Sequence, residues 1–159
     1  MAIHRRFPWI AVILLSAGFA AAQSRGNATN DPDLKEIRDY RLNMDIVQKY
    51  IRVAKAATAD PAAKKCFDNN PPTSLNAGEK MITACPPFAA HLSAAGVKPR
   101  EFLIITAALI GDYVAVGMKK KGTIKEYPPS ILPANAAFIE QNYDKLQTLL
   151  APLTGGEDK

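Results

Sequence analysis

One apolar run constrains this chain more than any other feature of the sequence. Residues 102–118 read FLIITAALIGDYVAVGM, and in these 17 positions only Thr106 and Asp112 carry clearly polar side chains. Three lysines follow, at 119–121. Such a run is compatible with a membrane span, with the central helix of a soluble bundle, or with a helix that builds a pocket around one carboxylate.

Length and charge favour the soluble bundle over the membrane span. A helix that crosses the hydrocarbon layer needs about 20 apolar residues, and an aspartate near its middle costs a few kcal/mol. The segments on either side are amphipathic and would have no partner in lipid. We therefore predict a buried central helix, and no transmembrane span in the mature chain.

The first 22 residues have the pattern of a secretory signal peptide. Arg5 and Arg6 precede an apolar stretch at 9–19, and three alanines then lead up to Gln23. Small residues before the cut are what a signal peptidase accepts, so we predict cleavage before Gln23 and export to the periplasm or the cell exterior. The apolar stretch is short for a span, and retention as an N-terminal anchor is the alternative.

The chain that remains after cleavage has the size and charge of one small domain. Removal of 22 of the 159 residues leaves 137, with 18 basic against 15 acidic residues and a formal charge of +3. This charge does not call for a nucleic-acid partner, and we expect none. We predict a flexible leader at 23–33, a single helical domain at 34–152 and a disordered tail at 153–159.

Helix start and stop signals recur along this domain and predict an all-α fold. Residues 34–58 show the clearest amphipathic pattern, and the last helix is expected from about Asn135 to Ala151. We predict a small helical bundle of about four main helices plus short ones. Asn43 is the expected N-cap of the helix within 34–58. The expected first residues or caps of the other helices are Asp60, Ser74, Pro87 and Pro99, and the expected stops are Gly96 and Gly122.

The two cysteines are expected to form a structural disulfide. Exported chains meet an oxidising environment, which favours a bridge between Cys66 and Cys85. Two separately buried thiols are the alternative, because buried cysteine behaves as a small hydrophobic residue.

Asp112 is the first candidate for a functional group. On a helical wheel it shares a stripe with Glu101, Ala108, Ala115 and Lys119, which is the least apolar stripe of the run. We expect Asp112 to point outward at the rim of the bundle. The alternatives are a buried structural carboxylate that pairs with a basic residue or caps a helix, and a pocket acid with a raised pKa.

His91 is the second candidate, and it is the only histidine after residue 22. We expect a partly exposed or hydrogen-bonded structural histidine, with a general base or ligand as the alternative. The sequence contains no recognisable metal, phosphate-binding or serine-nucleophile motif. We therefore expect no cofactor and no metal, and regard enzymatic activity as less favoured than binding.

Three stretches, YRLNMDIVQKYIRV, AAGVKPREFLIITAALI and PANAAFIEQNYDKLQTLL, resemble small exported all-helical bacterial proteins of uncharacterised function. The resemblance implies a periplasmic or secreted bundle and brings no catalytic residue with it. The preferred hypothesis is an exported binding or interaction module for a small apolar ligand or a protein partner. The alternatives are a small envelope enzyme that uses Asp112 and His91 as an acid/base pair, and a structural or envelope-stress protein without a pocket.

Overall fold

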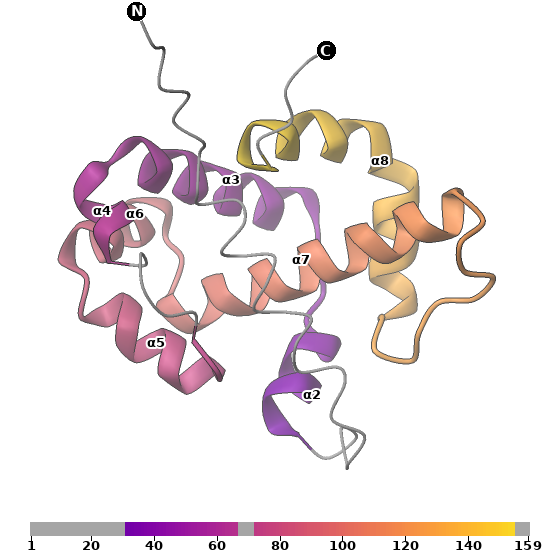
Figure 1. The fold of residues 1–159 in the computed structure, drawn as a ribbon, viewed down its shortest axis with the longest axis horizontal. Helices are drawn as coiled ribbons and strands as arrows, with labels where there is room; N and C mark the ends of the chain where they lie inside the picture. Colours follow the sequence, from indigo (N-terminus) through magenta and orange to yellow (C-terminus); the bar gives the residue numbers. More distant parts are fainter. Residues whose placement is uncertain (1–30, 67–71, 155–159) are drawn as a thin grey trace, which may run out of the picture.

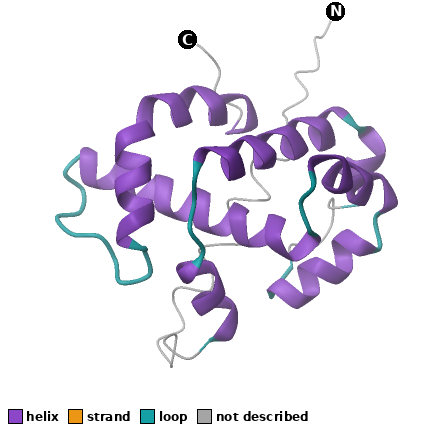
Figure 2. Cartoon of the chain, turned by 180° about the vertical axis from the view of Figure 1, so that it is seen from behind, coloured by secondary structure: helices purple, strands orange, loops and turns teal. Residues whose placement is uncertain are grey.

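The computed structural model describes residues 31–66 and 72–154, and α-helices are the only regular elements in this part of the chain (Figures 1 and 2). The all-α prediction is confirmed. The predicted signal peptide and its cleavage site lie outside the described residues. The helices are α2 (Pro32–Asp39), α3 (Met44–Ala59), α4 (Pro61–Lys65), α5 (Leu75–Thr83), α6 (Pro86–Ala95), α7 (Pro99–Lys120) and α8 (Pro133–Thr154).

The apolar run forms α7, which is the central element of the bundle. Helix α7 crosses the middle of the molecule and packs against α2, α3, α5, α6 and α8 (Figure 1). By length and composition α7 is also apolar enough to cross a membrane, and half of its most apolar 18-residue stretch is buried. The rest of that stretch is partly buried or exposed.

Most helix boundaries follow from local sequence signals. The side chains of Asn43, Asp60 and Ser74 each accept a backbone N–H in the first turn of the helix that they precede. These side chains therefore satisfy donors that have no partner within the helix. Gly96 ends α6 in the left-handed conformation with φ 67°, which glycine adopts without steric cost.

The predicted amphipathic helix with Asn43 as its N-cap is confirmed as α3, and a helix that the sequence did not predict, α2, precedes it. Helix α2 ends at Asp39, and the chain is extended at the caps Tyr40 and Asn43 before α3 begins. The predicted leader also ends too late: Asp31 caps α2, and Asp33 accepts the Leu75 N–H at 2.8 Å. This contact with a distant segment holds the start of α2 against the bundle.

The last helix is longer at both ends than predicted. It begins at Pro133, whose fixed φ suits a first helical position, rather than at Asn135. It continues to Thr154, and Leu153 packs against the hydrophobic core, so the first two residues of the predicted tail are helical. Partial burial of Leu153 stabilises this last turn, although the sequence that follows it is polar.

The larger of two buried apolar clusters in the described residues surrounds α7. Its fully buried members include Val47 of α3, Leu109 of α7 and Ile139 of α8. Aromatic rings close the end near α6, where Phe102 stacks on Tyr50 at 5.3 Å and meets the edge of Phe88 at 5.4 Å. Such ring pairs add stabilisation beyond the area that they bury.

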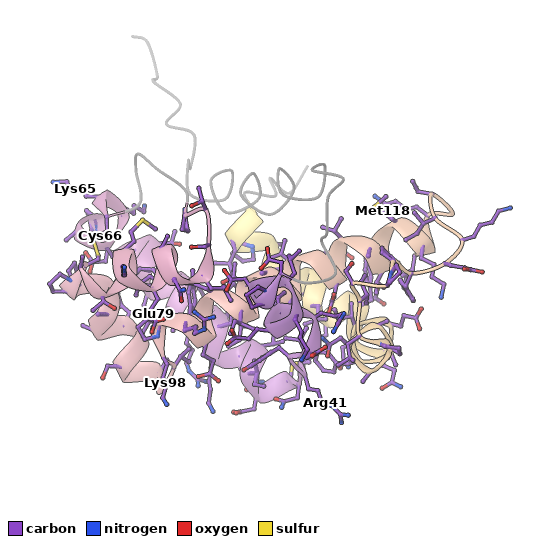
Figure 3. The ribbon with its side chains drawn as sticks, turned by 90° about the horizontal axis from the view of Figure 1, so that it is seen from below. Arg41, Lys65, Cys66, Glu79, Lys98 and Met118 are labelled. Carbon is purple, nitrogen blue, oxygen red and sulfur yellow. A yellow bond between two sulfur atoms is a disulfide. The ribbon has the colours of Figure 1, made fainter. Side chains whose placement is uncertain are left out.

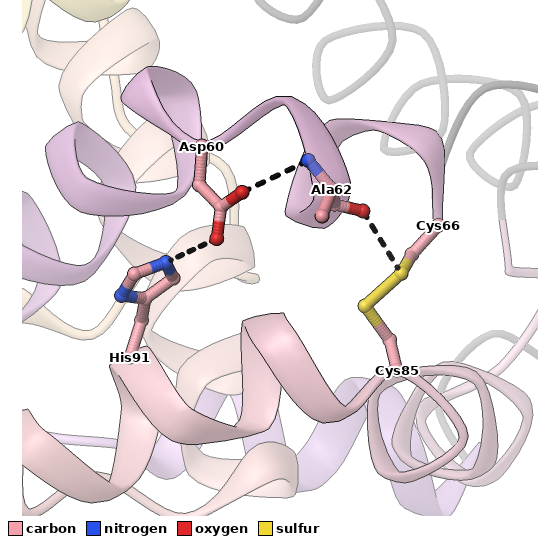
Figure 4. Close-up of a disulfide and its surroundings, with 5 residues drawn as sticks. All are labelled: Asp60, Ala62, Cys66, Cys85 and His91. Carbon is pink, nitrogen blue, oxygen red and sulfur yellow. Dashed lines mark hydrogen bonds and ion pairs between the residues drawn. A yellow bond between two sulfur atoms is a disulfide. The ribbon is translucent and has the colours of Figure 1, made fainter.

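The predicted disulfide is confirmed. Cys66, at the end of α4, is bonded to Cys85, at the start of α6, with 5.9 Å between their Cα atoms (Figure 4). Cys85 is 2% exposed and belongs to the core. The bridge therefore attaches the short helix α4, which buries only Ala63, to the body of the bundle.

We expect the double variant Cys66→Ala/Cys85→Ala to lose about 3 kcal/mol of unfolding free energy, because the bridge closes a loop with a sequence separation of 19. Chemical denaturation with and without a reductant measures this loss. The reductant should shift the midpoint of the wild type and leave that of the double variant unchanged. Equal stability of the two proteins under oxidising conditions would contradict the prediction.

Candidate functional site

Asp112 is buried, and the prediction that it points outward was wrong. The residue is 6% exposed, and its neighbours on the stripe, Ala108 and Ala115, are also buried. The stripe faces the start of α8, where Ala115 packs with Ile131 and Ala136. The two alanines thus serve a close helix contact, and Asp112 lies inside that contact.

The partner of Asp112 is Asn135, a residue of the first turn of α8 that is 1% exposed. Its Nδ2 donates to Asp112 Oδ2 at 2.9 Å and to the carbonyl oxygen of Tyr40 at 2.9 Å. Its Oδ1 accepts the backbone N–H of Leu42 at 2.9 Å. One amide therefore joins α7, α8 and the extended link between α2 and α3.

Burial raises the pKa of Asp112 from its ordinary value of 3.8 to about 6, against the opposing effect of the hydrogen bond from Asn135. Two hollows open at the surface, and neither has Asp112 in its lining. One, of about 490 Å³, lies along Tyr127–Pro129 and the start of α8, and the other, of about 520 Å³, lies on α5. Asp112 therefore lies between α7 and α8, where it accepts the Asn135 hydrogen bond.

His91 also has a structural partner. Its Nε2 lies 3.0 Å from Asp60 Oδ2, and the two side chains are 27% and 28% exposed (Figure 4). The pKa of Asp60 is lowered, because His91 and the backbone N–H groups of Ala62 and Ala63 donate to its carboxylate. This agrees with the expectation of a hydrogen-bonded structural histidine, here linking α6 to the cap of α4.

The fold therefore gives the two candidate residues separate partners. Asp112 bonds to Asn135 between α7 and α8, while His91 bonds to Asp60 beside the disulfide. The side chains of Asp112 and His91 share no hydrogen bond or ion pair in the described part of the chain. Residues 31–66 and 72–154 also hold no group of three or more potential metal-binding His, Cys, Asp or Glu side chains.

A charged cluster surrounds the first turn of α7. The Arg100 guanidinium contacts Glu36 and Asp33 of α2 at 2.5 and 3.4 Å, and Glu79 of α5 at 3.8 Å. Asn76 completes the set by accepting from Arg100 at 2.7 Å. The cluster holds three carboxylates and one guanidinium and so has a net negative charge, while Lys98 and Glu101 beside it add one charge of each sign.

The opposite end of α7 is basic. Lys119 lies over the ring of Tyr127 at 4.1 Å and contacts Glu140 at 3.5 Å, while Lys120 lies over the ring of Tyr143 at 4.4 Å. These cation–π contacts fix two lysines beside the helix carboxyl terminus, where positive charge is favourable. Lys121 follows them and is exposed.

Between its two charged ends, α7 has an apolar face that the described residues cover only in part. We call this face the α7 stripe; it consists of Ala107, Ile110, Gly111, Val114 and Met118, which recur at helical spacing. Gly111 is exposed, Met118 is 36% exposed and the other three are half-buried. The four side chains belong to neither of the two hydrophobic clusters formed by the described residues. Figure 3 shows Met118 and Glu79 in opposite halves of the molecule.

Gly111 leaves open space at the middle of the α7 stripe. A Cβ built at this position meets no described atom within 4 Å. Gly117, by contrast, lies against the Tyr143 hydroxyl, which would be 2.8 Å from such a Cβ. Packing against Tyr143 therefore requires a glycine at position 117, whereas the described residues leave room for a side chain at position 111.

The sequence alone did not reveal Asn135 or the α7 stripe. The sequence predicts Asn135 only as the approximate start of the last helix, although its place in the first turn after Pro133 was a usable signal. The stripe was missed because α7 is apolar on nearly all sides, so the wheel does not distinguish the covered faces from the open one.

We expect Asn135→Ala to destabilise the protein by about 2–4 kcal/mol, because it leaves the Leu42 N–H, the Tyr40 carbonyl and a buried carboxylate without their partner. Asn142→Ala is the matched control, since Asn142 donates only to Phe138 on its own helix at 2.8 Å. Urea denaturation compares the two variants. Equal losses would contradict the role assigned to Asn135.

We expect Asp112→Asn to stabilise the protein at neutral pH, by up to about 3 kcal/mol, because the amide oxygen can accept the Asn135 bond without a buried charge. The pKa of Asp112 is raised in the folded state, so the wild type gains stability as pH falls through 6 towards 3.8. The advantage of the variant should therefore shrink over this interval. Denaturation at several pH values measures the difference, and an advantage that does not change with pH would contradict the burial argument.

No protein-family model matches this chain, and the searches of curated proteins and of solved structures found no match. What the protein does is therefore inferred from its own residues.

Proposed function

We propose that this chain is an exported, non-enzymatic interaction module that binds a protein partner through the α7 stripe. The observation that carries the proposal is the partly uncovered apolar face of the central helix. Contiguous exposed apolar surface is uncommon on monomeric soluble proteins and often marks an interaction site. Charged groups frame the stripe at both ends, as the polar rim of an interface does.

A protein partner fits this face better than a small apolar ligand. Small-ligand sites are concave and enclose most of the ligand surface, whereas the α7 stripe is one face of a helix. The two surface hollows do not include its residues. The stripe presents side chains in a row, which suits packing against a second helix.

The enzyme alternative has less support from the geometry. An acid/base pair must reach one substrate together, and Asp112 and His91 have separate structural partners. Burial at 6% exposure also separates Asp112 from solvent. The other alternative is a structural or envelope-stress role without a binding face. Unlike the proposal, this role requires no contact between Gly111 and another molecule.

Export is the part of the proposal that rests on sequence alone. The signal-peptide pattern at 1–22 and the Cys66–Cys85 bridge both suit a periplasmic or extracellular protein. The mass of the protein recovered from its own host gives the start of the mature chain, which we expect at Gln23. Recovery of the uncleaved chain in the cytoplasm would contradict export.

We expect a photoreactive benzophenone amino acid at position 111 to form a discrete covalent adduct in intact host cells, because this position is open and lies at the middle of the α7 stripe. The same amino acid at Ala94, an exposed position of α6, should form none. Gel electrophoresis and mass spectrometry after irradiation compare the two.

A second variant tests whether formation of the adduct depends on the α7 stripe. Adding Val114→Asp to the position-111 protein should abolish the adduct, because a carboxylate in an apolar contact is costly to desolvate. Circular dichroism checks that this protein still folds. The absence of an adduct at 111, identical adducts at 111 and 94, or an adduct that survives Val114→Asp would contradict the interaction module.

A further inference from the structure

We infer that the partner of the α7 stripe is a second copy of this chain, bound with the two α7 helices antiparallel about a twofold axis near Gly111. This inference rests on the proposed function and names the occupant of the same face. Its basis is that the stripe is complementary to itself in both shape and charge.

The apolar part of the stripe contains no charged side chain between Ala107 and Met118, a rise of about 17 Å along the helix. In a twofold interface the same patch is used on both subunits, so it has to be self-complementary. Gly111 lies near the centre of the stripe between Ile110 and Val114, and Ala107, the other small residue, lies one turn before it at the amino-terminal end. Two such faces can approach closely at Gly111 and pack the branched side chains around the crossing.

The charges at the two ends select the antiparallel arrangement. The amino-terminal end of α7 carries the cluster of Asp33, Glu36 and Glu79 around a single Arg100. The carboxyl-terminal end carries the lysines at 119–121, of which Lys120 and Lys121 are exposed. In an antiparallel pair each basic end faces the acidic end of the other copy, whereas a parallel pair brings like charges together. The like charges that a parallel pair brings together disfavour that arrangement.

The length of the contact predicts a weak, reversible dimer. Stable specific interfaces bury about 1,200 Å² or more, and a single helix face of this length supplies only part of that area. The charged ends must therefore contribute to association, and the dimer should weaken as salt is added. Salt dependence is a direct consequence of the proposed arrangement.

Sedimentation velocity over a concentration series tests the inference on protein expressed from the full coding sequence, so that any processing has taken place. We expect a monomer–dimer equilibrium for the wild type and monomer alone for Gly111→Lys, which places two like charges at the axis. The monomer should tolerate this substitution, since no described atom lies within 4 Å of the new Cβ. Ala94→Lys adds the same charge on exposed α6 and should dimerise like the wild type.

Charge reversal tests the antiparallel orientation. Glu79→Lys and Lys121→Glu should each weaken the dimer several-fold, and the double variant should recover most of the loss, because the two reversed charges again face each other. A wild type that is monomeric throughout, a dimer that persists in Gly111→Lys, or a double variant no tighter than the single ones would overturn the inference.

The adduct formed at position 111 separates failure of this inference from failure of the proposed function. An adduct with twice the mass of the chain supports the second copy. An adduct with a different protein, together with a monomeric wild type, overturns the second copy and leaves the interaction module standing. A cross-link from position 111 to residues 1–30 of the same chain would contradict both.

Discussion

The arrangement of the helices around α7 depends on one buried amide. Asn135 uses both ends of its side chain, donating to Asp112 and to the Tyr40 carbonyl and accepting from the Leu42 N–H. Without these bonds, a buried carboxylate and two backbone groups would lose their partner at the junction of three segments. Burial of such groups is tolerated only when they are hydrogen-bonded, so this junction has one acceptable geometry.

The Asn135 junction also explains why α7 is covered unevenly. It draws the start of α8 onto the stripe of α7 that contains Ala108, Asp112 and Ala115, which was the face with the most polar character. Because α7 is apolar on nearly all sides, the neighbouring helices do not cover all of its apolar surface. The partly uncovered α7 stripe is the consequence, and it is where the proposed function lies.

Several polar side chains join the small helices to the bundle. His91 and Asp60 join α6 to α4 beside the Cys66–Cys85 bridge, and the short helix α4 depends on these attachments because it buries little of its own surface. Arg100 similarly joins α2, which contains no fully buried residue, to α5 and α7. Polar side chains in this protein attach small helices to the bundle, while apolar side chains supply the surface available for binding.

The sequence by itself determined the helical class and most helix boundaries, because caps, prolines and apolar periodicity act over a few residues. It favoured the disulfide only because the chain has one pair of cysteines and the pattern of an exported protein. Asn43, Asp60, Ser74 and Gly96 mark boundaries whatever the rest of the chain does. The break at Tyr40, the burial of Asp112 and the open face at Gly111 were decided only by the tertiary structure. They depend on Asn135, which lies 93 residues from Leu42 along the chain, and on which side of an almost uniformly apolar helix its neighbours occupy. Local sequence carries no information about that choice, because every side of α7 offers nearly the same hydrophobic gain.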